Sequence, residues 1–215
     1  MERSPFLKNN KEVLFLVIMY FVGIVGHLIP STRNLMIILT PFTLLLTGGV
    51  VTYKSFFPAN KKFLFWGIST YLITFSLEVI GVKTGLVFGG YNYGTALGFK
   101  VFEVPLIIGF NWVLVILGAI SISKSYTKNI ILISLTAAVL SVMFDYFLEP
   151  VAINLGYWHW NQISVPLQNY LAWFVIAFIF SIALLKIKSD FNQGVSKEYF
   201  LIQFTFFIIL NLFMR

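Results

Sequence analysis

The sequence contains no cysteine, which excludes disulfides, thiolate nucleophiles and cysteine-ligated metals. Charge is scarce, because 11% of the 215 residues are charged, whereas a soluble domain averages about 25%. The glycine-rich segments lack the strand and helix context of a nucleotide fold, and no Walker loop or nucleophile elbow is present. The last apolar run, 198–214, contains no lysine, so it cannot form a rhodopsin-like Schiff base.

Long apolar runs recur along the whole chain, and 59% of the residues are hydrophobic. This pattern predicts an all-α, polytopic membrane protein that forms a single integral membrane domain over residues 1–215. The first run has no small-residue cleavage site after it, so we expect a span there and not a cleaved signal peptide. Seven spans are predicted, at about 12–30, 34–53, 62–81, 104–123, 129–150, 167–186 and 198–214.

The net charge of +7 has an ordinary explanation in membrane topology, so we expect no nucleic-acid partner. With the N-terminus inside, eleven basic residues fall in inner segments: Arg3, Lys8, Lys11, Lys54, Lys61, Lys62, Lys124, Lys128, Lys186, Lys188 and Lys197. Four fall in outer segments: Arg33, Lys83, Lys100 and Arg215. This bias predicts a cytoplasmic-membrane protein whose loops 82–103 and 151–166 face outward.

These two outer loops resemble each other. The first half reads Glu78, "GGYNYG" and "VPLIIGFNW", and the second reads Glu149, "LGYWHWN" and "VPLQNYLAW". Val-Pro-Leu is followed by tryptophan at the same distance in both halves, since Pro105 precedes Trp112 as Pro166 precedes Trp173. We therefore predict a tandem repeat, with units at about 62–123 and 129–186 and a site at their interface.

Four of the eight acids gather near the outer ends of the middle spans: Glu78, Glu103, Asp145 and Glu149. We expect the other four acids to be solvated: Glu2, Glu12, Asp190 and Glu198. Carboxylates inside membrane segments are costly and therefore tend to be functional. Glu78 and Asp145 are expected at similar depth, and Asp145 and Glu149 share a helix face at i,i+4. For Glu103 and Glu149 the alternative is an interfacial, wet carboxylate, and Glu103 can instead cap the helix that Pro105 opens.

Crowded, desolvated carboxyl groups retain a proton to higher pH, as a general acid at neutral pH requires. Glu78, Asp145 and Glu149 are therefore the candidate catalytic residues. The glycines of loop 85–94 allow it to fold back over these helices. Trp158 and Trp160 can instead belong to an interfacial aromatic belt, and neither histidine sits in a metal-ligand pattern. The candidate substrate contacts are Tyr91, Tyr93, Asn111, Trp112, Trp158, His159, Asn169 and Trp173.

The stretches "EVIGVKTGLVFGGYNY", "VPLIIGFNW" and "FDYFLEPVA…LGYWHW…VPLQNYLAW" resemble the membrane-integral carotenoid biosynthesis protein family. The resemblance covers about residues 60–180. Characterised members of that family are carotenoid hydratases, as in γ-carotene 1′-hydratase and bisanhydrobacterioruberin hydratase, and the family looks distantly related to membrane lycopene cyclases. The resemblance implies a carotenoid substrate with an acyclic end and water as co-substrate.

The implied reaction protonates a terminal trisubstituted alkene, forms a tertiary carbocation and captures it with water. Nothing is oxidised, so we expect no cofactor and no metal. Asp145 or Glu78 is the expected proton donor, with Glu149 orienting or deprotonating the water. Three alternatives remain open at this point: a cyclase that excludes water, a proton-coupled transporter, and a protein that binds carotenoid unchanged. The oligomeric state does not follow from the sequence.

Overall fold

The computed structural model describes residues 10–57, 60–187 and 193–214, and seven helices form its frame. Six of the helices are long and apolar enough to cross a membrane, which confirms a multi-pass, mainly α-helical protein. Within the described residues, seven helices follow the order of the seven predicted spans, with ends that differ by a few residues, but only six of them have the length and apolarity of a span. The helices are α2 Asn10–Leu28, α3 Pro30–Phe56, α4 Lys61–Thr84, α5 Ile107–Ser123, α6 Ile130–Asn154, α7 Leu167–Lys186 and α8 Gln193–Phe213.

The fourth predicted span is shorter than expected. It starts at Ile107 and not at 104, because Val104 and Pro105 belong to a short strand, and its 17 residues reach about 26 Å. The hydrocarbon core of a bilayer is about 30 Å thick. All residues of α5 except Phe110 and Asn111 are buried, so protein surrounds this helix along its length.

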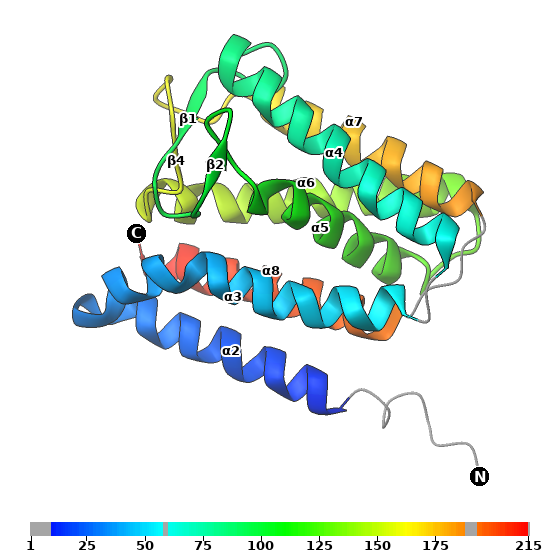
Figure 1. Ribbon diagram of the computed structural model, residues 1–215, viewed down its shortest axis with the longest axis horizontal. Helices are drawn as coiled ribbons and strands as arrows, with labels where there is room; N and C mark the ends of the chain where they lie inside the picture. Colours follow the sequence, from blue (N-terminus) through cyan, green and yellow to red (C-terminus); the bar gives the residue numbers. More distant parts are fainter. Residues whose placement is uncertain (1–9, 58–59, 188–192, 215) are drawn as a thin grey trace.

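The other helices pack around α5 and α6 in two groups. Figure 1 shows α4 and α7 on one side of this central pair, and α2, α3 and α8 on the other. All helices run along one direction of the molecule, so that alternate connections lie at opposite ends. The turn between α2 and α3, both predicted outer loops and the described C-terminal end therefore share one end, which we call the loop end.

Local sequence signals explain several helix ends. The Asn60 side chain accepts hydrogen bonds from the first backbone N–H groups of α4, and Asn129 does the same for α6. At its other end α4 stops at Gly85, whose φ of 69° is left-handed. The predicted fifth span ended at Pro150, but α6 continues to Asn154, because this proline lies in the last turns and removes only one backbone donor.

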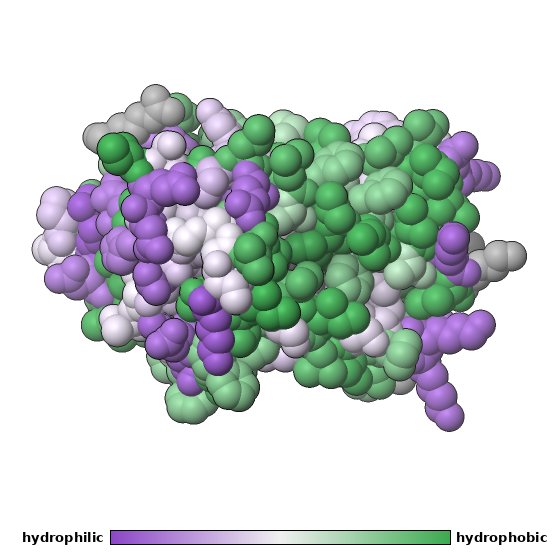
Figure 2. Space-filling view, turned by 90° about the horizontal axis from the view of Figure 1, so that it is seen from above, coloured by the Kyte–Doolittle hydropathy of each residue, from purple (hydrophilic) through white to green (hydrophobic). Residues whose placement is uncertain are grey.

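Apolar side chains cover the middle of the molecule, and polar side chains gather at both ends (Figure 2). The exposed apolar residues of α3 illustrate the lipid-facing surface: Leu35, Ile38, Leu39, Phe42, Leu45 and Leu46. The helix ends opposite the loop end carry Lys54, Lys61, Lys62, Lys124 and Lys186. Residues Glu2, Arg3, Lys8, Lys188, Asp190 and Arg215, used in the sequence predictions, lie outside the described residues. The orientation in the membrane stays a prediction.

The loop end contains short strands that the sequence analysis did not predict. β1 Tyr91–Tyr93 pairs antiparallel with β4 Trp158–Trp160, and β2 Lys100–Val101 pairs with β3 Val104–Pro105. The first pair joins the two similar outer loops directly, with Asn92 opposite His159. Duplication of the two halves stays a prediction, but the halves do meet at this strand pair.

Gly94 makes this pairing possible. Its N–H donates to the Tyr157 carbonyl oxygen at 2.8 Å, and a Cβ at Gly94 would lie 2.0 Å from the Gly156 carbonyl oxygen. We expect Gly94→Ala to push β1 away from β4 and to lower the free energy of unfolding by about 1–3 kcal/mol. Thermal unfolding of the protein in detergent measures this loss. Gly49→Ala is the control, since beyond its chain neighbours and the adjacent backbone of α3 no described atom lies within 4 Å of a Cβ there. Equal unfolding temperatures for the two variants would contradict the prediction.

Candidate active site

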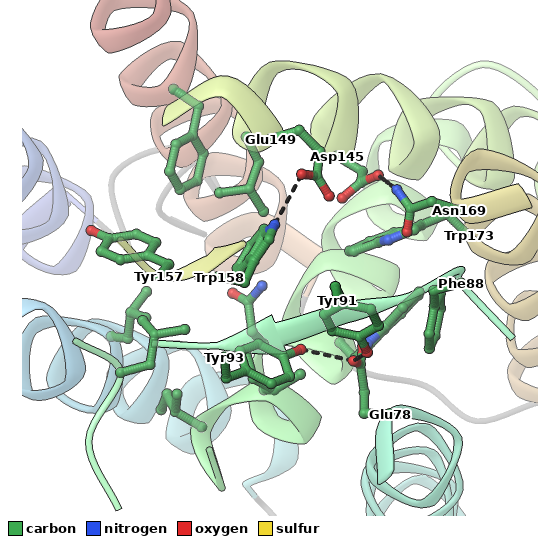
Figure 3. A pocket seen from close by; sticks show the side chains of 18 of the residues that line it. Glu78, Phe88, Tyr91, Tyr93, Asp145, Glu149, Tyr157, Trp158, Asn169 and Trp173 are labelled. Carbon is green, nitrogen blue, oxygen red and sulfur yellow. Dashed lines mark hydrogen bonds between the residues drawn. The ribbon is translucent and has the colours of Figure 1, made fainter. Parts of the chain in front are cut away.

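Three carboxyl groups line one cavity of about 60 Å³ at the loop end. Glu78 comes from α4, whereas Asp145 and Glu149 come from successive turns of α6, and all three are buried. Figure 3 shows the two α6 acids on one side of the cavity and Glu78 on the opposite side. The predicted convergence of these acids from separate helices is therefore observed.

Glu78 accepts three hydrogen bonds. The hydroxyls of Tyr91 and Tyr93 both donate to Oε2, the second at 2.7 Å, and the Trp112 indole donates to Oε1 at 2.8 Å. The loop that carries the tyrosines thus folds back over α4, as its glycines predicted. Donors aimed at a carboxyl group favour its ionised form, so Glu78 is the buried acid with the most hydrogen bonds to stabilise a negative charge.

The two tyrosines act here as neutral donors. Burial, together with the adjacent Glu78 carboxyl, raises the pKa of Tyr91 and of Tyr93 well above its usual value. Both phenols therefore keep their protons across the physiological pH range. The backbone of Tyr93 is also fixed, because the Lys100 ammonium donates a hydrogen bond to the Tyr93 carbonyl oxygen at 2.6 Å.

Glu149 has its own pair of donors on the other strand. The indole N–H groups of Trp158 and Trp160 donate to Glu149 Oε2 at 2.9 and 2.8 Å. The members of each donor pair are two positions apart, so the alternation of a strand points both side chains to one face. The paired strands thus present two tyrosines to Glu78 and two tryptophans to Glu149. This assignment replaces the interfacial-belt interpretation of the two tryptophans.

Asp145 has the fewest donors of the three acids. Within the described residues it accepts one hydrogen bond, from Asn169 Nδ2 to Oδ2 at 2.6 Å. Its exposed fraction is 1%, and Glu149 lies one helical turn further along the same face. Asp145 is therefore a desolvated carboxyl group beside a second one, with little hydrogen bonding to stabilise a negative charge.

Aromatic rings form much of the remaining wall. Trp112 and Trp173, the tryptophans at matching positions after Val-Pro-Leu, stack with centroids 3.8 Å apart and planes 25° apart. The Phe88 ring lies beside Trp112, and the Tyr91 and Trp160 rings lie 5.0 Å apart across the strand pair. The faces of such rings attract a cation in a cavity from which water is excluded.

The cavity collects ten of the eleven residues that the sequence suggested for the site. These are Glu78, Tyr91, Tyr93, Asn111, Trp112, Asp145, Glu149, Trp158, Asn169 and Trp173. His159 lies elsewhere, because it is the exposed middle residue of β4, and its position does not support substrate contact.

Glu103 is separate from the three buried acids. It is exposed in the tight turn between β2 and β3, where Phe102 and Glu103 both have positive φ, 50° and 71°. This backbone is typical of a two-residue hairpin turn. Its exposure fits the alternative of a wet carboxylate. The role as a helix cap is not observed, since Leu106 occupies the N-cap of α5 without a side-chain hydrogen bond.

Several lining residues were missed from the sequence, among them Phe88, Trp160, Tyr157, Gln203 and Phe207. Trp160 could have been predicted from the sequence, because it stands two residues after Trp158 and therefore shares its face of a strand. Gln203 carried a signal too, as a polar residue inside the last apolar run. Phe88 and Phe207 carried none, since phenylalanines are spread along the whole chain.

Within the described ranges, no group of three or more His, Cys, Asp or Glu side chains is arranged to hold a metal ion. The three acids have aromatic and amide donors as their partners, and these donors are not metal ligands. A reaction without metal or cofactor stays a prediction. The donor set fits proton transfer and stabilisation of a positive charge.

The comparisons with known proteins identify a family and a distant relative. The sequence model of the family described as "Carotenoid biosynthesis protein" matches residues 35–215, a longer stretch than the resemblance at 60–180. Bisanhydrobacterioruberin hydratase of Haloarcula japonica is 29% identical over 137 residues, which cover 57% of this chain and 44% of that protein. The chain thus spans less than half the length of this relative, and no solved structure matches it significantly. Because the family match covers most of the sequence, the chain belongs to the carotenoid biosynthesis protein family.

Proposed function

We propose that this protein adds water across the terminal double bond of an acyclic carotenoid end. The observation that carries the proposal is the unequal hydrogen bonding of three buried acids in one aromatic cavity. Protonation and hydration of an alkene need an acid, a base and a stabilised cation, and these acids differ in the ways those roles require. The name of the Haloarcula japonica relative, a hydratase, supports the same reaction.

Asp145 is the proposed proton donor. Glu78 accepts three hydrogen bonds and Glu149 accepts two, whereas Asp145 accepts one within the described chain. A carboxyl group that holds a proton needs fewer donors, because its own O–H is a donor. Asp145 also has no counterpart in the other half. Glu78 and Glu149 each accept hydrogen bonds from the strand of their own half. Four residues before Glu78 stands Thr74, whereas four residues before Glu149 stands Asp145.

Glu78 and the stacked tryptophans are proposed to stabilise the carbocation. The proton from Asp145 goes to the CH carbon of the alkene, so the positive charge develops on the carbon that bears two methyl groups. An ionised Glu78, held by three donors, supplies a fixed negative charge across the cavity. The faces of Trp112 and Trp173 add a cation-stabilising surface without providing a nucleophile.

Glu149 is proposed to complete the addition. A water oxygen forms a bond to the tertiary carbon, and the surplus proton of this water passes to a carboxylate, for which Glu149 is placed beside Asp145. A proton returned from Glu149 to Asp145 restores the starting state. The sum is the addition of one water, with no oxidation and no cofactor. The cavity of about 60 Å³ receives the end of the polyene, and the rest of the chain remains outside it.

Expression in a lycopene-producing bacterium tests this function. We expect carotenoids that are heavier by one water, or two where both ends react, in chromatography with mass spectrometry of the extracted pigments. An unchanged mass with a new ring would support the cyclase alternative, which shares the protonation step but excludes water. Unchanged pigment held by the purified protein would support a binding protein, and transport predicts flux without a product. Vector-only cells provide the background.

A further inference from the structure

A second cavity of about 140 Å³ lies between α2, α3 and α8, and we call it the side chamber. The cavity lined by Glu78, Asp145 and Glu149 is called the acid cavity. Four residues line both the side chamber and the acid cavity: Leu44, Tyr157, Gln203 and Phe207. The two spaces are therefore neighbours separated by one layer of side chains. The three acids and the tryptophans of the acid cavity do not line the side chamber, so the proposed reaction assigns it no role.

Three buried polar atoms of the side chamber make no hydrogen bond of good geometry within the described chain: Tyr20 OH, His27 Nε2 and Gln203 Oε1. Their side chains are at most 5% exposed. The Tyr20 and Gln203 side chains do lie beside the buried Tyr199 hydroxyl. A buried polar group without a partner is costly, and lipid tails offer none. Groups of this kind in one cavity are normally satisfied by internal water, which needs about 10–15 Å³ and two to four polar partners.

The polar groups of the side chamber extend from the loop end to the wall that the chamber shares with the acid cavity. His27 lies in the last turn of α2, and Tyr20 lies two turns deeper on the same helix face. Gln203 and Tyr157 stand between the side chamber and the acid cavity, and the Tyr157 hydroxyl lies 3.1 Å from Thr40 Oγ1. Burial raises the pKa of Tyr157 to about 12, so this hydroxyl stays neutral and can exchange hydrogen bonds with water.

We propose that the side chamber stores the water that is added to the carotenoid and delivers it past Gln203 and Tyr157. This inference rests on the proposed hydratase function and deepens it, because it assigns the source of the nucleophile. A hydrocarbon chain is the rival occupant, since much of the chamber wall is apolar. Water fits better, because beside a polyene His27 Nε2 would have no partner in the described chain. Tyr20 OH and Gln203 Oε1 would then depend on the neighbouring Tyr199 hydroxyl.

Deuterium exchange separates protonation from water capture. In deuterated buffer, a carbocation that is not captured returns a proton to a carboxylate, and the recovered alkene then carries deuterium at its CH carbon. Hydrated product and deuterated substrate thus report two successive steps. The assay uses membranes that contain the full chain and lycopene, with rates normalised to the amount of inserted protein.

The test variant is Tyr20→Phe combined with Gln203→Leu, which removes two polar groups of the side chamber while largely keeping its volume. We expect about a tenfold fall in hydrated product, because the variant removes two hydrogen-bonding sites for water. Deuterium exchange should be retained. Ser181→Ala is the control, because Ser181 Oγ is also buried and unpartnered in the described chain but lines neither cavity.

Two results would overturn the inference. Unchanged hydration in the double variant would show that the chamber does not supply water, and equal loss of hydration and exchange would indicate that it holds the polyene. A wild-type protein that neither hydrates nor exchanges deuterium would overturn the hydratase function, and the inference with it. Because the wild type is measured first, this failure is distinguishable from the other two.

Discussion

Asp145→Asn is expected to abolish both hydration and deuterium exchange of an acyclic carotenoid. Asparagine keeps the shape of the side chain and can still accept the hydrogen bond from Asn169 Nδ2, now 2.6 Å from the carboxyl oxygen. It has no acidic proton to transfer, and general-acid catalysis contributes about 10²–10⁴-fold to a rate. The rate of deuterium entry into lycopene, measured in membranes containing equal amounts of protein, should therefore fall at least about 100-fold.

The matched control is Glu103→Gln, which makes the same acid-to-amide change at an exposed carboxyl group in the β2–β3 turn. Full activity is expected there, because Glu103 does not line the acid cavity. Retention of deuterium exchange by inserted Asp145→Asn protein would remove Asp145 from the donor role. Loss of exchange in Glu78→Gln alone would then transfer that role to Glu78.

Glu149→Gln should separate the two steps instead of removing both. The glutamine oxygen can still accept from the indoles of Trp158 and Trp160, so the strand pair keeps its anchor. A neutral amide cannot take the surplus proton from water, and hydration should fall by about 10²-fold, within the range of general-base catalysis. Deuterium exchange should continue, because Asp145 still protonates the alkene.

The ratio of hydrated product to deuterated substrate measures this separation. It should fall in Glu149→Gln and be undefined in Asp145→Asn, which makes neither product. If Glu149→Gln loses exchange while Asp145→Asn keeps it, the roles of the two α6 acids are reversed. A wild-type ratio in Glu149→Gln would show that another group, or the water itself, accepts the proton.

The sequence was sufficient to predict which acids converge. Glu78, Asp145 and Glu149 stand out because a carboxyl group near the end of an apolar span has few ordinary explanations. The matching distances from Pro105 to Trp112 and from Pro166 to Trp173 placed both tryptophans near those acids, and the structure stacks them. Long apolar runs and the scarcity of charge were enough for the spans, since both are local properties.

The sequence was not sufficient to predict what each acid touches. The Asn92 side chain donates a hydrogen bond to that of Asn161, which is 69 residues away in the sequence. No local pattern specifies a three-residue strand with so distant a partner. For the same reason His159 was expected at the site. The register that turns Trp158 and Trp160 inward turns His159 outward, and this alternation becomes visible only once the strand is known.

The β1–β4 pair also has a consequence for how the protein is made. β1 emerges before α5 and α6, whereas β4 follows them, so the donors of Glu78 and of Glu149 are synthesised at well-separated times. Loop closure over such a distance is slow compared with formation of a helix. The strand donors of each acid lie within 15 residues of it, but the strand pair that fixes both sets of donors over one cavity can form only late in folding, after most of the chain has been synthesised. Catalytic competence is then expected to appear as one of the last events of biogenesis.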